Sequence, residues 1–233
     1  MLAETGLGAG RWDDALETGL RAIAVGEERG FSRVVYRNWF VLLPIAQARR
    51  REDLFRRARQ HFPTWSEAGP SDSTFARIVV TAAQLRLAAA GLEPPFVPEV
   101  EWALPSFDLD HGGPSWLAAV ETVVEAWLAA GEHDGAEKAL DRMRARLDLS
   151  PTTRLASAVE ALLRARLRSA QRRREDAASD ARGALDLLGE GGPWWRAKAI
   201  RVLHEAGGAE EALISRAARL ESQLGISPGH ASA

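Results

Sequence analysis

Few residues in this sequence have the types and spacing that chemistry requires. Asp108, Asp110 and His111 fall in one short stretch, and carboxylate and imidazole groups can together hold a hard cation or zinc. The edge of a solvated loop explains the same cluster with fewer assumptions. His204-Glu205 lacks the second histidine, four residues away, that a helical zinc protease needs. We therefore expect no metal site.

A phosphate site and a catalytic centre are also poorly supported. The stretch Gly6-Leu-Gly-Ala-Gly10 is glycine-rich, but neither a Lys-Ser/Thr pair nor a preceding strand accompanies it, as a phosphate loop requires. The five histidines are scattered and cysteine is absent, so no nucleophile–base pair can be assembled. The sequence predicts a protein that is not an enzyme and that carries no cofactor.

Arginine gathers in two segments, residues 44–62 and 160–175, each with a net charge of +4. A groove lined by them could attract an acidic peptide or a phosphate backbone. The alternative is that they are solvated helix faces and turns. The whole chain is close to neutral at -2, which gives no reason to expect nucleic acid or a membrane as a partner. With no signal peptide and no apolar run long enough to span a bilayer, a cytoplasmic location is expected.

The elements that must position these residues are predicted to be helices. Hydrophobic residues make up 46% and charged residues 27% of the chain, which is ordinary for a folded domain. Strong helix formers dominate, and the alternation typical of strands is missing. Apolar residues recur at three- and four-residue spacing, as in Trp12, Ala15, Leu16, Gly19, Ala22 and Ile23. An all-α fold follows.

Turn signals between these helices recur at a nearly constant period. They fall 40, 41, 40, 41 and 35 residues apart, at Gly10, Arg50, Gly91, Gly131, Arg172 and Gly207. Such a period predicts an array of two-helix hairpins, none of which can bury its apolar face alone. Five residues past the turns, mostly small side chains would let two helix axes approach closely; these are Ala15, Phe55, Ala136, Ala177 and Ala212.

The period fails after Gly91. Residues 92–114 contain five of the eleven prolines and five acidic residues, without Lys or Arg, which predicts a loop in place of a helix. This insert could lie along the basic groove and occupy the partner site, or it could be a packed connector that covers apolar surface. The predicted division is into helical repeats at 1–91, the Pro-rich acidic loop at 92–114, helical repeats at 115–225 and a flexible tail at 226–233.

Two stretches carry a resemblance to a known family. Gly10-x-Trp12-x-x-Ala15 followed by Ala22, and Trp127-x-x-x-Gly131-x-His133-x-x-Ala136, resemble tetratricopeptide repeats. The ending that begins at Pro193-Trp-Trp-Arg-Ala resembles the C-terminal repeats of large bacterial ATP-dependent regulators of the MalT/LuxR or adenylate-cyclase-linked type. The period near 40 departs from the 34 residues typical of the family. In those regulators the repeat arm implies sensing or partner binding.

The expected architecture is therefore a tetratricopeptide-like α-solenoid of about five helical hairpins, whose concave face is built from the first helix of each hairpin. We expect a non-catalytic protein-interaction module, scaffold or sensory, of a bacterial-type signalling or transcriptional regulator, with a protein or peptide partner. The alternative is a regulatory arm that senses a small ligand in a pocket between repeats. The first helix of each hairpin can be aligned with the repeat motif to find the residues that face the concave side, and Trp102 is added as an aromatic residue of the insert. The predicted partner-binding residues are Arg37, Gln47, Glu121, Glu125, Arg166 and Trp102.

Overall fold

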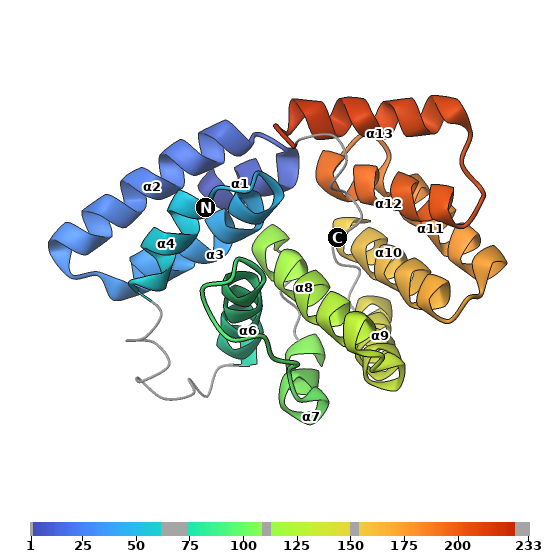
Figure 1. Cartoon of the computed structure of the whole chain (residues 1–233), viewed down its shortest axis with the longest axis horizontal. Coiled ribbons are helices and arrows are strands. Elements are labelled where there is room, and N and C mark those ends of the chain that lie inside the picture. Colours follow the sequence, from blue (N-terminus) through green and yellow to red (C-terminus); the bar gives the residue numbers. More distant parts are fainter. Residues whose placement is uncertain (1, 62–73, 109–112, 150–153, 227–233) are drawn as a thin grey trace. The chain divides into compact units, whose positions relative to one another are not determined.

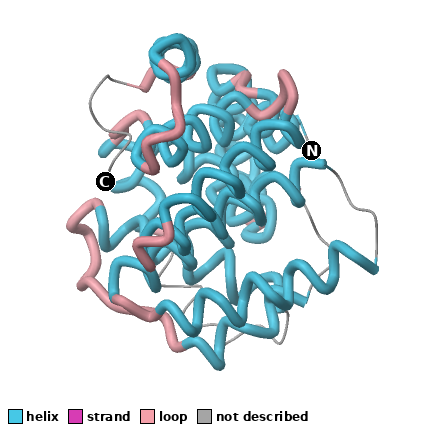
Figure 2. The backbone as a smooth tube through the Cα atoms, turned by 90° about the vertical axis from the view of Figure 1, so that its right-hand side faces the viewer, coloured by secondary structure: helices cyan, strands magenta, loops and turns pink. Residues whose placement is uncertain are grey.

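The chain folds as a packed array of helices. The computed structural model describes residues 2–61, 74–108, 113–149 and 154–226. Within these ranges it contains twelve α-helices and one 3-10 helix, and no strand. Figure 2 shows that helices account for most of the described backbone. The all-α prediction is confirmed, and the array is compatible with a helical repeat fold.

The chain divides into two compact units. Unit 1 comprises residues 1–98 and 113–123, and unit 2 comprises residues 99–112 and 124–233. Helix α8, Pro114–Ala130, contributes its first part to unit 1 and its last part to unit 2. The segment 92–114, which the sequence suggests as a separate insert, is likewise shared between the units.

Unit 1 is built from antiparallel helical neighbours. Helix α2 packs on α3, α1 packs on α2, and α3 also contacts α4 and α6 (Figure 1). Trp12 and Trp39 belong to its core and are 1% and 0% exposed. The helices of this unit, besides α8, are α1 (Leu2–Ala9), α2 (Trp12–Arg29), α3 (Ser32–Ala48), α4 (Glu52–Arg59) and α6 (Thr74–Ala89).

Unit 2 repeats this arrangement. Helix α10 packs on α11, α11 on α12, α12 on α13 and α9 on α10 (Figure 1, yellow to red). Trp194 and Trp195 are both buried, although adjacent residues of a helix point in different directions. The elements of this unit are α7 (Val100–Ala103), η1 (Leu104–Asp108), α9 (His133–Leu149), α10 (Arg154–Ala170), α11 (Arg174–Leu188), α12 (Pro193–Glu205) and α13 (Glu211–Gln223).

All six predicted turn residues have left-handed backbone conformations. Their φ values lie between 52° at Arg50 and 81° at Gly131. At Gly131 the N–H of Glu132 donates to the carbonyl of Trp127 (2.8 Å), and the N–H of Gly131 donates to that of Leu128 (3.2 Å). This pair of bonds is the Schellman motif, which satisfies the last carbonyls of a helix and redirects the chain. The turn predictions are therefore confirmed.

The small residues after the turns lie in the hairpin interfaces, with one exception. Ala15, Ala136 and Ala177 are fully buried, and Phe55 is 4% exposed. Ala212 is exposed, so its prediction is wrong. After Gly207 the chain does not re-enter a helix until Glu211, which moves the packing face along α13. The buried small residue of that helix is Ala217, which packs with Ala197 and Ile200.

Residues 100–108 form two short helices where the sequence predicts a loop. Within unit 2 the Phe107 ring stacks on Trp127, with centroids 5.9 Å apart and planes at 26°. A Cβ on Gly135 would lie 2.5 Å from Val100 Cγ2, so this glycine makes room for α7 against α9. For these residues the structure agrees with a packed connector, because Phe107 and Ala103 are fully buried.

Two glycine-to-alanine substitutions are expected to change stability in opposite directions. At Gly131 a Cβ would meet no atom within 4 Å, but φ is +81°, so Gly131→Ala should lower the free energy of unfolding by about 1–2 kcal/mol. A Cβ on Gly183 would also meet no atom within 4 Å, and this residue lies in the regular helix α11. Gly183→Ala should therefore raise the free energy of unfolding by about 0.5–1 kcal/mol. Urea unfolding followed by circular dichroism measures both, and equal effects would contradict the left-handed turn.

The connector gives a second prediction. Phe107→Ala should lower the free energy of unfolding by about 3–5 kcal/mol, because it removes a fully buried ring that stacks on Trp127. Phe96→Ala is the matched control, since Phe96 is 40% exposed in the same connector. The same urea titration should show a change below about 1 kcal/mol for the control. Similar values for the two variants would refute the packed connector.

Candidate functional site

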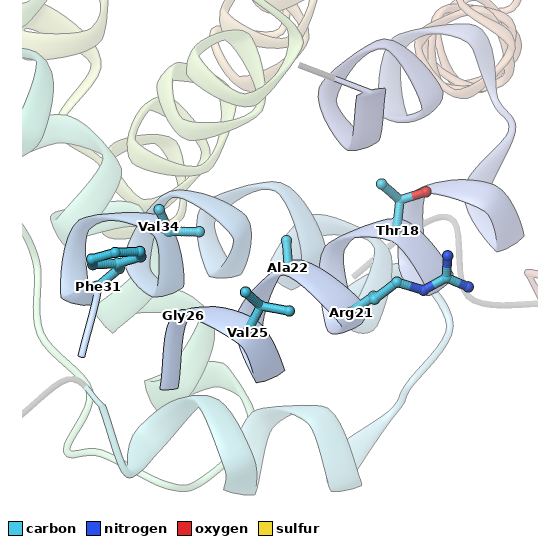
Figure 3. A pocket seen from close by; sticks show the side chains of 7 residues that line it. All are labelled: Thr18, Arg21, Ala22, Val25, Gly26, Phe31 and Val34. Atoms are coloured by element: carbon cyan, nitrogen blue, oxygen red, sulfur yellow. The ribbon is translucent and has the colours of Figure 1, made fainter. Parts of the chain in front are cut away.

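An apolar hollow of about 410 Å³ lies on unit 1 where α2 ends and α3 begins (Figure 3). Three large apolar side chains there remain exposed to solvent: Val25 by 43%, Phe31 by 54% and Val34 by 40%. Adjacent exposed apolar side chains around a concavity are typical of a binding surface. The full lining is Thr18, Arg21, Ala22, Val25, Gly26, Phe31 and Val34.

The turn at Gly30 creates this hollow. Gly30 has φ +68°, and the N–H of Phe31 donates to the Gly26 carbonyl at 2.8 Å. A Cβ on Gly26 would come within 2.8 Å of Val35 Cγ2, so the missing side chain lets α2 and α3 close on each other. Phe31 is the N-cap residue of α3 and lies between the two helices, which keeps its ring outside the core.

The sequence prediction missed this hollow, although a signal was present. At most of the left-handed turns, the residue that follows the turn position is polar or small, as at Arg11, Arg51 and Glu132. At the turn of Gly30 this residue is Phe31. A large aromatic side chain there indicates an apolar group outside the hairpin core.

One arginine lines the hollow, and three more lie on the same two helices within four residues of a lining residue. Arg21 belongs to its lining and donates to Glu17 at 2.6 Å, with both side chains more than 70% exposed. Arg29 ends α2, and Arg33 lies in the first turn of α3. Arg37, one turn of α3 beyond Val34, is 69% exposed and has its Nη2 atom 3.7 Å from the Glu4 carboxylate.

Gln47 and Glu121 are the other two residues of unit 1 that are predicted to bind a partner. Gln47 is hydrogen-bonded within the unit, and Glu121 is buried in it. Arg86, 3% exposed, donates to Gln47 Oε1 (3.1 Å), to the Ala118 carbonyl (2.6 Å) and to Thr122 Oγ1 (2.6 Å). Gln47 thus belongs to a polar network that joins α3, α6 and α8. Glu121 is 1% exposed. Their partner-binding roles stay predictions.

In unit 2 the structure brings Glu125 and Arg166 together. Arg166 Nη1 donates to Glu125 Oε1, and Lys198 Nζ lies 3.9 Å from the same oxygen. The Lys198 ammonium lies 4.3 Å from the ring centroid of Trp194, within cation–π range. The sequence did not indicate Lys198, because only the tertiary fold places α12 beside α10. Trp102, on α7, is partly exposed.

Most arginines of the two basic segments form ion pairs within their own unit. In residues 44–62, five of the six arginines pair with carboxylates, among them Arg49 with Asp13 at 2.5 Å and Arg57 with Glu27 at 2.9 Å. In residues 160–175, Arg164 pairs with Asp141 and with Glu160, a carboxylate that is only 1% exposed. These pairings favour the interpretation of the segments as charged helix faces over an open basic groove.

Comparison of the chain with protein-family models, with curated proteins and with solved structures finds no match. None of the helices within the described ranges is long and apolar enough to cross a membrane. Over the same ranges no group of three or more His, Cys, Asp or Glu residues could hold a metal ion. Asp110 and His111, two of the candidate ligands, lie outside the described residues.

One partly buried carboxyl group, that of Asp180, predicts a pH effect. Burial raises the pKa of Asp180, with Arg168 and Arg164 opposing the shift. The folded state therefore holds this proton more tightly than the unfolded state, and stability falls as pH rises through the interval between the two pKa values. Asp180→Asn should raise the free energy of unfolding at pH 7, and the gain should vanish near pH 3.5, below the ordinary carboxyl pKa of about 3.9.

Urea unfolding at the two pH values measures this difference. The exposed Asp186, on the same helix α11, provides the control Asp186→Asn, which should leave stability unchanged at both. Destabilisation by Asp180→Asn at pH 7 would show that the nearby arginines outweigh burial.

Proposed function

We propose that this chain is a non-catalytic protein-interaction module, scaffold or sensory, and that the hollow on α2 and α3 holds a side chain of its partner. The observation that carries the proposal is the exposure of Val25, Phe31 and Val34 around one concavity. Covering such surface releases about 25 cal/mol per Å² of apolar area, and aromatic residues often dominate interfaces. A protein partner that inserts an apolar side chain would gain this free energy.

A small-ligand sensor is the second candidate, and the size of the hollow favours it. Its volume of about 410 Å³ lies within the roughly 300–1,000 Å³ of small-molecule sites. Its place between α2 and α3 also corresponds to a pocket between successive hairpins. Such sites, however, usually enclose about 70–90% of a ligand's surface. The wide exposure of Phe31 and Val34 makes this hollow too shallow for that, so we prefer a protein partner.

The wider architecture supports the same proposal. Antiparallel helical pairs with left-handed turns about 40 residues apart are what an α-solenoid of about five hairpins would contain. In such an array, Arg37 and the cluster of Glu125, Arg166 and Lys198 would belong to first helices and so to the concave face. The placement in a bacterial-type signalling or transcriptional regulator rests on the sequence resemblance alone.

A selection experiment tests the proposal. Random peptides displayed on phage are selected on the full chain, and their affinities are then measured for Phe31→Asp. This variant places a charge in the apolar hollow, so affinity should fall at least roughly tenfold. Phe96→Asp introduces the same change at another exposed phenylalanine of unit 1 and should leave affinity unchanged.

The outcomes separate the two candidates. Selected peptides that bind both variants equally well would refute the hollow as the partner site. A thermal-shift screen against metabolites is run in parallel on the same proteins. A ligand whose stabilisation is lost in Phe31→Asp, without any peptide that depends on Phe31, would establish the small-ligand sensor instead.

A further inference from the structure

Arginines on α2 and α3 indicate the charge of the partner that the hollow would bind. On α2, Arg21, Val25 and Arg29 are spaced four residues apart and so follow one stripe of the helix. On α3, Arg33 directly precedes Val34 in the sequence, and Arg37 follows Val34 one helical turn later. Arg21 thus belongs to the lining, and Arg29, Arg33 and Arg37 each lie within four residues of a lining residue. Glu17 and Glu28 are the acidic residues at three- or four-residue spacing from Arg21 or Val25 on α2.

These arginines are available for binding to different degrees. Arg29 and Arg33 are exposed, and neither forms an ion pair with a residue in the described ranges. The pair between Arg21 and Glu17 is so exposed that solvent screens it and it contributes little to stability. A ligand carboxylate can therefore replace Glu17 at little cost. This contrasts with Arg49 and Arg164, whose side chains are 14% exposed and pair within their unit.

We infer that the partner is an acidic peptide segment in which one large apolar side chain enters the hollow and flanking carboxylates meet Arg29 and Arg33. The inference rests on the function proposed above. Burial of the apolar side chain supplies most of the affinity. The guanidinium N–H groups donate two parallel hydrogen bonds to each carboxylate and so orient the segment over the hollow.

The shape of the site favours a peptide over an anionic membrane, which the same charges could attract. A peripheral protein inserts apolar side chains that protrude from a convex surface or helix face. Here Val25, Phe31 and Val34 line a concavity (Figure 3), which fits a side chain that enters it. Vesicle binding is nevertheless included as an outcome of the test.

The experiment uses the full chain and the peptides that depend on Phe31. Replacement of each peptide's Asp and Glu by Asn and Gln should weaken binding roughly fivefold to tenfold, and so should the double substitution Arg29→Gln/Arg33→Gln. The loss should shrink in 0.5 M salt, because exposed charges are then screened. Arg174→Gln/Arg219→Gln removes the same charge from exposed positions of unit 2 and should leave affinity unchanged.

Each result has one meaning. Peptides that depend on Phe31 but bind equally well after neutralisation of their acids would overturn the acidic partner and leave the interaction function standing. The absence of any peptide that depends on Phe31 would overturn both. Cosedimentation with phosphatidylserine–phosphatidylcholine vesicles that is lost in Phe31→Asp and in Arg29→Gln/Arg33→Gln would overturn the peptide in favour of a membrane surface.

Discussion

The fold depends on one backbone conformation, the left-handed residue that ends a helix and turns the chain into the next. At this position the following N–H groups satisfy the last carbonyls of the helix, so the chain can reverse without leaving those groups unpaired. Gly10, Gly91 and Gly131 adopt it readily. Arg50 and Arg172 adopt it at a conformational cost, which shows that the turn is retained even where glycine is absent.

Local rules explain how much of this fold the sequence predicts. A turn needs only its own residues, and a hairpin interface needs a small residue such as Ala136 at a fixed distance from the turn. The failures come where distant residues decide. Residues 100–108 become helical because Phe107 stacks on Trp127 and Val100 fits over Gly135, and no local pattern reports those contacts. Ala212 fails because the last turn is wider than the others.

The candidate site was less predictable than the fold for a related reason. Helical register puts Glu125 and Arg166 on the first helices of their hairpins, but it cannot tell whether they bind a partner or each other. In this structure they pair with each other, and most arginines of the two basic segments likewise pair with carboxylates of their own unit. Phe31 was overlooked because it lies in a turn, where periodicity gives no information, and only comparison with the other turns distinguishes it.

The hollow and the scaffold arise from the same turn, yet they make separate demands on the sequence. Gly30 and Gly26 bring α2 and α3 together, and any residue that can cap α3 would complete that turn. Phe31, Arg29 and Arg33 add little to the core because their side chains lie at the surface. A large aromatic ring exposed at a position where stability does not require it needs another explanation, and contact with a partner supplies one.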